Sequence, residues 1–200
     1  MLVVNGLVLD NEPEYLFPNY SNNFELLVSV ILSAQTTDEG VNKVTPALFK
    51  RFPKPADMAN ASLYEIEKYI KTIGLYKSKA KYIKQSAEIL MSEFDGIVPD
   101  DPRELQKLKG VGRKSAVAII SNAFNKNIGI PVDTHVIRFA KRFKLSNKKD
   151  PSKIEQDLLK IIPKKNWKRA GYAIKEYGRK EGRSRGYSSE NDPIVKMLKR

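Results

Sequence analysis

The chain has 200 residues, 41% of them hydrophobic, so it is long enough to bury a core and is not expected to be disordered throughout. It has no cysteine and one histidine, His135, which excludes a disulfide framework, a thiolate nucleophile and a cysteine-ligated zinc or iron–sulfur site. No apolar run approaches the roughly 20 residues of a membrane span, and the N-terminus lacks the pattern of a secretory signal. We therefore expect a cytoplasmic protein with no targeting signal and no membrane contact.

Positive charge is concentrated near the C-terminal end of the chain. The formal net charge is +13, and residues 141–200 carry 19 basic and 7 acidic side chains, whereas residues 1–140 carry 17 and 16. This asymmetry favours a polyanionic partner, most simply a nucleic acid. On charge alone, a solvated basic face without a partner remains the alternative.

Helical periodicity runs through most of the chain, and no segment shows the sustained alternation of a strand. The spacing of Phe24, Leu27, Val28 and Ile31 predicts a largely buried helix. Ser62 and Glu65 form the pattern of a capping box, and Gly74 is expected to end the helix that follows as a left-handed cap.

Further helices are predicted along the rest of the chain. One covers residues 78–94, a second begins after Asp101 as N-cap, a third covers 113–124, and a fourth follows Asp133 as N-cap. Two more are expected at 152–161 and 167–177. From residue 178 the segment GRKEGRSRGYSSENDP is polar and turn-rich, which predicts a loop, and PIVKMLKR is compatible with one last helical turn.

A glycine-rich hairpin joins two of these helices in the segment LKGVGRKSA (108–116). Gly110 and Gly112 flank Val111, which we expect to tuck into the hairpin. Amides of Gly110, Gly112 and Arg113 can point outward at the start of the next helix, which is the arrangement of a phosphate site. The alternative is an ordinary turn between two helices.

This hairpin resembles the helix–hairpin–helix of the endonuclease III family of DNA glycosylases. The segments LLVSVILSAQTTD (26–38), YIKTIGLYKSKA (69–80), GIVPDD (96–101) and IPVDTHVIR (130–138) are similar to segments of that family, in the same order. The resemblance implies an all-α fold of two helical lobes with a DNA-binding cleft between them. One lobe would be 20–127, with the helix–hairpin–helix at about 102–125, and the other 1–19 plus 128–200.

The resemblance also implies the catalytic residues. Lys114 matches the nucleophile, whose amine attacks C1′ of the damaged nucleoside and forms a Schiff base, after which β-elimination cuts the strand. The helix dipole and neighbouring cations disfavour the charged form of this amine. Asp133 matches the carboxylate that stabilises positive charge on the sugar, and it would face Lys114 across the cleft. His135 is expected to be structural.

Residues that contact DNA follow from the same resemblance. Gln35 and Leu75 match residues inserted into the base stack when a base is extracted; read without the family, Gln35 is a polar helix end and Leu75 a core residue. The hairpin residues expected to bind DNA are Leu108, Gly110, Val111, Gly112 and Arg113. The basic C-terminal loop adds Lys180, Arg183 and Arg185.

The sequence departs from the family where most members bind a [4Fe–4S] cluster through four cysteines. Those four positions fall near Gly182, Ser189, Asp192 and Leu198, none of which is a cysteine. We therefore expect no iron–sulfur cluster and no other metal centre. In this family a monovalent cation can bind the hairpin carbonyls, here around Leu108 to Val111.

The resemblance implies base excision repair by a monomer that acts on double-stranded DNA, at the nucleoid if the source is prokaryotic. The expected reaction is removal of oxidised pyrimidines, of the thymine glycol type, followed by cleavage 3′ to the abasic site. Oxidised guanine stays open as a further substrate. Two alternatives stay open: a non-catalytic helix–hairpin–helix DNA-binding module, and a monofunctional mismatch or alkylpurine glycosylase. A lysine at 114 argues against both.

Overall fold

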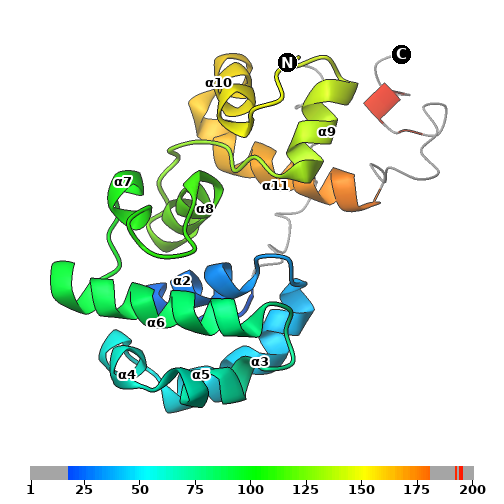
Figure 1. The fold of residues 1–200 in the computed structure, drawn as a ribbon. Helices are drawn as coiled ribbons and strands as arrows, with labels where there is room; N and C mark the ends of the chain where they lie inside the picture. The colour runs from blue at the N-terminus through cyan, green and yellow to red at the C-terminus, as the bar shows by residue number, and fades with distance from the viewer. Residues whose placement is uncertain (1–17, 181–191, 193, 196–200) are drawn as a thin grey trace. The chain divides into compact units, whose positions relative to one another are not determined.

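The computed structural model describes residues 18–180, 192, 194 and 195. All regular structure in these residues is helical, so the predicted all-α fold is confirmed (Figure 1). The chain divides between Lys126 and Asn127 into two compact units. We call them the N-terminal unit (described residues 18–126) and the C-terminal unit (described residues 127–180, 192, 194 and 195). In the described ranges, no helix is long and apolar enough to cross a membrane.

The N-terminal unit holds seven of the helices labelled in Figure 1. They are α2 (Asn23–Leu32), α3 (Asp38–Arg51), α4 (Pro55–Asn60), α5 (Leu63–Ile70), α6 (Tyr76–Glu93), α7 (Pro102–Leu105) and α8 (Arg113–Ala123). The unit also includes Asn19, whose amide donates a hydrogen bond of 2.8 Å to the Asn42 side chain of α3. Asn19 is therefore anchored to α3 of this unit.

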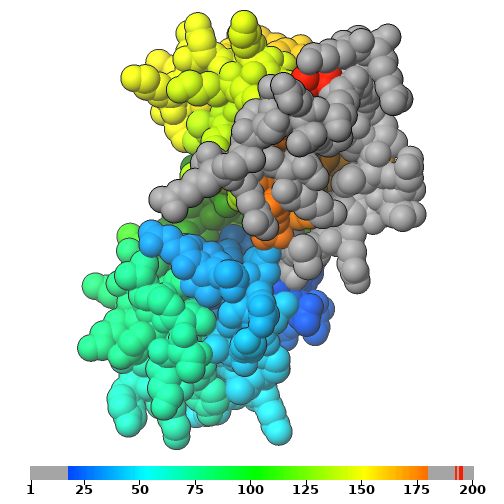
Figure 2. Space-filling view, turned by 90° about the vertical axis from the view of Figure 1, so that its right-hand side faces the viewer, coloured from blue at the N-terminus to red at the C-terminus, as the bar shows by residue number. Residues whose placement is uncertain are grey.

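The long helix α6 is central to the N-terminal unit, with α2 on one side and α4 and α5 on the other (Figure 1). Leu26 and Leu27 of α2 and Ile83 and Leu90 of α6 are completely buried. Each aliphatic side chain of this kind stabilises the fold by about 1.5–3 kcal/mol. In the space-filling view, α2 to α6 (blue to green) close into one continuous surface (Figure 2).

Local capping chemistry sets several helix starts where the sequence predicts them. Ser62 and Glu65 form a reciprocal capping box, with hydrogen bonds of 3.2 Å and 3.0 Å between side chain and backbone. The Asp101 carboxylate accepts hydrogen bonds from the amides of Arg103 at 2.7 Å and Glu104 at 3.2 Å. Each cap satisfies amides that have no partner inside the helix.

The prediction that Gly74 ends α5 in a left-handed conformation is wrong. The helix ends at Ile70 with a right-handed Lys71 as C-cap, and Gly74 has no positive φ. The left-handed residue is Leu75, with φ of +58°, which is the N-cap of α6. The left-handed residue of this turn therefore lies one position after the predicted glycine, and it carries a side chain.

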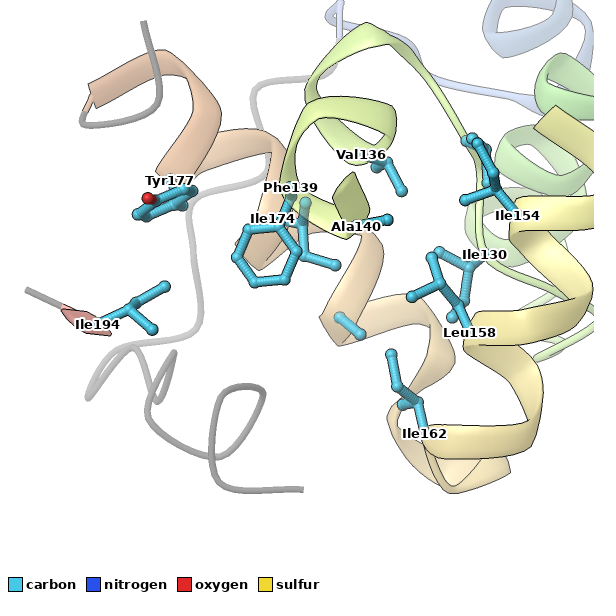
Figure 3. Close-up of a cluster of buried hydrophobic side chains, with 12 residues drawn as sticks. Ile130, Val136, Phe139, Ala140, Ile154, Leu158, Ile162, Ile174, Tyr177 and Ile194 are labelled. Carbon is cyan, nitrogen blue, oxygen red and sulfur yellow. The ribbon is translucent and has the colours of Figure 1, made fainter. Parts of the chain in front are cut away.

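The C-terminal unit is built from α9 (Thr134–Arg142), α10 (Pro151–Ile161), the short 3₁₀ helix η1 (Lys164–Asn166) and α11 (Trp167–Lys180). Its core joins all three α-helices: Phe139 comes from α9, Leu158 from α10 and Ile174 from α11 (Figure 3). Ile194, near the end of the chain, is 2% exposed and belongs to the same cluster. The predicted helices at 152–161 and 167–177 are confirmed, and α11 continues three residues further.

Candidate active site

The hairpin between α7 and α8 rests on side chains of α2 and α6. Gly110 has a φ of +82°, and a Cβ added to it would lie 3.2 Å from Ile31 Cγ2 and 3.2 Å from Tyr82 Cδ2. The Ser86 hydroxyl, from α6, donates a hydrogen bond of 3.0 Å to the Lys109 carbonyl. The left-handed conformation therefore favours glycine at 110, and an added Cβ would also press on Ile31 and Tyr82.

Gly112 differs from Gly110, because the fold does not require it to be glycine. Its backbone is extended, with φ of −92°, and a Cβ added to it would meet nothing within 4 Å. It is the N-cap of α8 and provides no side-chain cap, unlike Asp101 before α7. The start of α8 has no side-chain cap and has open space beside it, so the predicted phosphate site stays a prediction that this geometry allows.

The other predicted hairpin residues divide by exposure. Leu108 is 2% exposed and Val111 is 6% exposed, so their side chains belong to the core and only their backbone faces a ligand. Arg113 is half-buried in the first turn of α8. Lys114 is the second residue of α8 and is exposed, at the positive end of the helix dipole.

Gln35 and Leu75 are both exposed and both left-handed. Their φ angles are +53° and +58°, and Leu75 is 58% exposed, so the interpretation of Leu75 as a core residue is wrong. Residues with side chains rarely adopt this conformation, and when they do the strain often marks a functional position. The fold thus presents to solvent the two side chains that the resemblance assigns to insertion into DNA.

A buried lysine joins the segments that carry these two residues, and the sequence analysis missed it. Lys79 is 3% exposed, and its ammonium group donates a hydrogen bond to the Thr36 hydroxyl. Its amide donates to the Leu75 carbonyl at 3.0 Å. Burial lowers the pKa of Lys79. One residue therefore contacts the neighbour of Gln35 through its side chain and Leu75 itself through its backbone.

Asp133 lies in the C-terminal unit as the N-cap of α9. Its Oδ1 accepts hydrogen bonds from the amides of His135 at 2.8 Å and Val136 at 3.0 Å, so the predicted cap is confirmed. Since Lys114 belongs to the N-terminal unit, the prediction that the two residues face each other across a cleft stays a prediction.

His135 lies against α11 rather than standing alone. A Cβ added to Gly178 would overlap the His135 ring, so glycine is required there for α11 to approach α9. His135 Nδ1 is 3.0 Å from Arg138 Nη2. Because a guanidinium only donates hydrogen bonds, Nδ1 accepts and the ring proton of the neutral imidazole lies on Nε2. This packing holds the first turn of α9, which Asp133 caps.

A buried aspartate, Asp192, lies near one of the positions where the resemblance places a cluster cysteine. Asp192 is 2% exposed; it accepts a hydrogen bond from the Tyr177 hydroxyl and another from the Ile194 amide at 2.9 Å. Arg142 in turn donates to the Tyr177 hydroxyl at 2.9 Å. Burial, with the Asp192 hydrogen bond, raises the pKa of Tyr177. These groups do not fit an iron–sulfur cluster, because a carboxylate tied to a tyrosine stands in place of a thiolate.

The described residues show no grouped metal ligands and include only part of the predicted basic loop. Among the described residues, no three His, Cys, Asp or Glu side chains are grouped to hold a metal ion. Of the predicted basic loop, Lys180 ends α11, but its side chain, Arg183 and Arg185 lie outside the described residues.

Comparison with known proteins agrees with this geometry. Residues 28–164 match the HhH-GPD superfamily of base excision DNA repair proteins. The chain is 44% identical over 161 residues to Endonuclease III of Synechocystis sp., covering 80% of this chain and 74% of that relative. It is 38% identical over 184 residues to Endonuclease III of Bacillus subtilis, covering 90% and 82%.

Solved structures give the same assignment. A trapped Endonuclease III–DNA covalent intermediate is 36% identical with a TM-score of 0.90, and covers 99% of this chain and 96% of that one. A non-covalent Endonuclease III–DNA complex is 36% identical with a TM-score of 0.89, covering 97% and 91%. A thermostable thymine-DNA glycosylase, 20% identical with a TM-score of 0.81, shares the fold. The chain therefore belongs to the endonuclease III family, DNA glycosylases with abasic-site lyase activity within the HhH-GPD superfamily of base excision DNA repair proteins.

Proposed function

We propose that this enzyme removes oxidised pyrimidines of the thymine glycol type from double-stranded DNA and then cleaves the strand 3′ to the abasic site. The observation that carries the proposal is an exposed lysine, Lys114, which is the second residue of α8. The N-cap of this helix is Gly112, where an added Cβ would meet open space. A DNA-binding module without catalysis requires the hairpin but not this lysine.

Lys114 acts as the nucleophile in its neutral form. Its Nζ forms a bond to C1′ as the C1′–N bond breaks, and the base leaves with the electron pair and takes up a proton. Opening of the sugar ring and loss of a proton from Nζ produce a Schiff base. Removal of a C2′ proton then expels the 3′ phosphate, and hydrolysis frees the lysine.

Asp133 provides the negative charge that stabilises the cationic sugar during bond cleavage. The amides of His135 and Val136 hold Oδ1 of this carboxylate at the start of α9. Gln35 and Leu75 occupy the space that the extracted base leaves in the stack, which costs a few kcal/mol to open. Their exposure on left-handed turns supports this role.

The enzyme works without an iron–sulfur cluster in this proposal. The chain has no cysteine, and Asp192 and Ile194 are held in the C-terminal unit by the Tyr177–Asp192 hydrogen bond and by the burial of Ile194. A monovalent cation on the hairpin stays a prediction. The Leu108 and Lys109 carbonyls accept hydrogen bonds from Val111 and Ser86, and each keeps a second lone pair for a cation.

The partner is double-stranded DNA, which the enzyme engages as a monomer at damaged bases or abasic sites. Its predicted place in the cell is the cytoplasm, at the nucleoid. The +12 charge of residues 141–200 supports sequence-independent attraction to the DNA backbone.

The proposal is tested by borohydride trapping on three duplexes that contain thymine glycol, an abasic site or no damage. We expect a covalent adduct with the first two and none with the third. Base release from thymine glycol with no adduct on either damaged duplex would indicate a monofunctional glycosylase. Binding with neither release nor adduct would indicate a non-catalytic module.

A further inference from the structure

A hollow of about 510 Å³ opens at the C-terminal end of α9, in the C-terminal unit. Four lysines line it, Lys141, Lys144, Lys148 and Lys149, with Ile137 on its apolar side. All four lysines are exposed, and within the described residues none of their ammonium groups has an ion-pair or hydrogen-bond partner. In Figure 2 the segment that carries them (yellow-green to yellow) projects side chains into solvent.

The backbone that carries these lysines is held in place. Ser146 is 8% exposed; its hydroxyl donates a hydrogen bond of 2.7 Å to Asp157 and accepts one of 3.2 Å from the Lys148 amide. Lys144 is left-handed, with φ of +54°, and the next amide, that of Leu145, donates to the Ala140 carbonyl at 2.8 Å. Glycine is the usual residue at such a helix end, so a lysine here is strained.

Within the described residues no ion pair joins these lysines to the nearby carboxylates. Asp157 accepts the Ser146 hydrogen bond, and Asp150 caps α10 through the Lys153 amide at 3.0 Å. Four lysine side chains therefore line one concavity, and among the described residues no ion pair compensates their charge. Such an arrangement is typical of a site for a ligand of high negative charge.

We propose that this hollow binds a chain of closely spaced phosphate groups, as in inorganic tripolyphosphate or a nucleoside triphosphate. Four cations match the roughly four negative charges of a triphosphate, and the volume lies in the range of about 300–1,000 Å³ typical of small-molecule sites. The wall formed by Ile137 and the lysine stems can also cover an apolar part of the ligand.

This site is separate from the proposed catalytic carboxylate. Asp133 caps the N-terminus of α9, whereas the hollow lies at its C-terminus, and nine residues of α-helix span about 13 Å. A ligand in the hollow therefore lies away from the Asp133 cap, and the inference goes beyond the proposed function.

The test is an NMR titration of the full chain with inorganic tripolyphosphate in metal-free buffer, followed through the backbone amides of residues 144–149. We expect saturable shifts, and about tenfold weaker binding in Lys148→Gln/Lys149→Gln, because two charge-assisted contacts are lost. Lys153→Gln/Lys160→Gln is the matched control. It removes the same charge from exposed lysines of α10 outside the hollow. Its affinity for tripolyphosphate should stay within about twofold of the wild-type value.

Two further titrations separate the sources of phosphate. ATP and an undamaged 15-base-pair duplex are each added to the wild-type chain and to the Lys148→Gln/Lys149→Gln variant. Selective loss of tripolyphosphate and ATP affinity supports the proposal. An equal loss of duplex affinity would assign the hollow to the DNA backbone and overturn it. Unsaturable shifts in the wild type, or equal weakening in the control variant, would overturn it as well.

Discussion

The Lys79 ammonium group donates a hydrogen bond to the Thr36 hydroxyl, and so joins the turn that presents Gln35 to the helix that begins after Leu75. Methionine fills a similar volume without a donor, so Lys79→Met should keep the fold and loosen both turns. We expect single-turnover excision of thymine glycol to slow about tenfold, because misplaced side chains lower the fraction of productive complexes. Cleavage of a preformed abasic site, which needs no base extraction, should slow less.

Lys77→Met is the matched control for Lys79→Met, because Lys77 lies on the same helix and is exposed. It should leave excision unchanged. Thr36→Val should reproduce the Lys79→Met effect from the other side of the hydrogen bond. If Lys79→Met slowed excision and abasic-site cleavage equally, the lysine would have a general structural role and no special link to insertion.

The two hairpin glycines should separate stability from DNA binding. Gly110→Ala should lower the free energy of unfolding by about 1–2 kcal/mol, because a Cβ meets Ile31 and Tyr82 and its φ is left-handed. Gly112→Ala should cost only about 0.5 kcal/mol, since its Cβ meets open space and alanine is a slightly poorer N-cap. Denaturant unfolding measures both.

We expect Gly112→Ala to bind DNA about fivefold more weakly, because its methyl group stands where a phosphate approaches α8. Fluorescence anisotropy measures this affinity. Wild-type affinity in this variant would show that the α8 N-terminus does not contact the DNA backbone.

Two substitutions of Asp133 separate its roles as cap and as charge. Asparagine caps a helix about as well as aspartate, so Asp133→Asn should leave the free energy of unfolding within about 0.5 kcal/mol, whereas Asp133→Ala should lose about 1 kcal/mol. Both should slow base excision about 100-fold or more, because both remove the carboxylate charge. Excision at the wild-type rate in Asp133→Asn would reduce Asp133 to a helix cap.

Tyr177→Phe removes the hydrogen bond that ties Asp192 to α11, and should destabilise the protein by about 1–2 kcal/mol at pH 7. The folded protein raises the pKa of Tyr177 above its unfolded value of about 10. The stabilisation by the protonated phenol is therefore complete below about pH 10 and is lost as the pH rises above it. The difference between wild type and Tyr177→Phe should shrink over that range in unfolding experiments, and a constant difference would contradict this.

Local chemistry made much of the fold predictable. Ser62, Asp101 and Asp133 cap helices where the sequence places them, because a cap depends on residues within one turn. Gly74 misled the prediction, because the left-handed residue of this turn is Leu75, a position that glycine propensity does not indicate.

The supports of the site were harder to predict, because they depend on contacts distant in sequence. Lys79 and Thr36 are 43 positions apart, although Lys79 shares helical spacing with the buried Ile83, Ser86 and Leu90, which is a signal that could have been followed. Asp192 gave no such signal, because its burial depends on Tyr177 of α11.

The most direct test of the account identifies the residue that is trapped on DNA. The enzyme is reduced with borohydride on a thymine glycol duplex, digested with a protease that does not cleave at lysine, and the adduct is located by tandem mass spectrometry. We predict that the adduct lies on Lys114, and that Lys114→Gln folds with an unchanged unfolding midpoint but forms no adduct, because an exposed lysine contributes little to stability. An adduct on another lysine, or trapping that persists in Lys114→Gln, would contradict the assignment of Lys114 as the nucleophile.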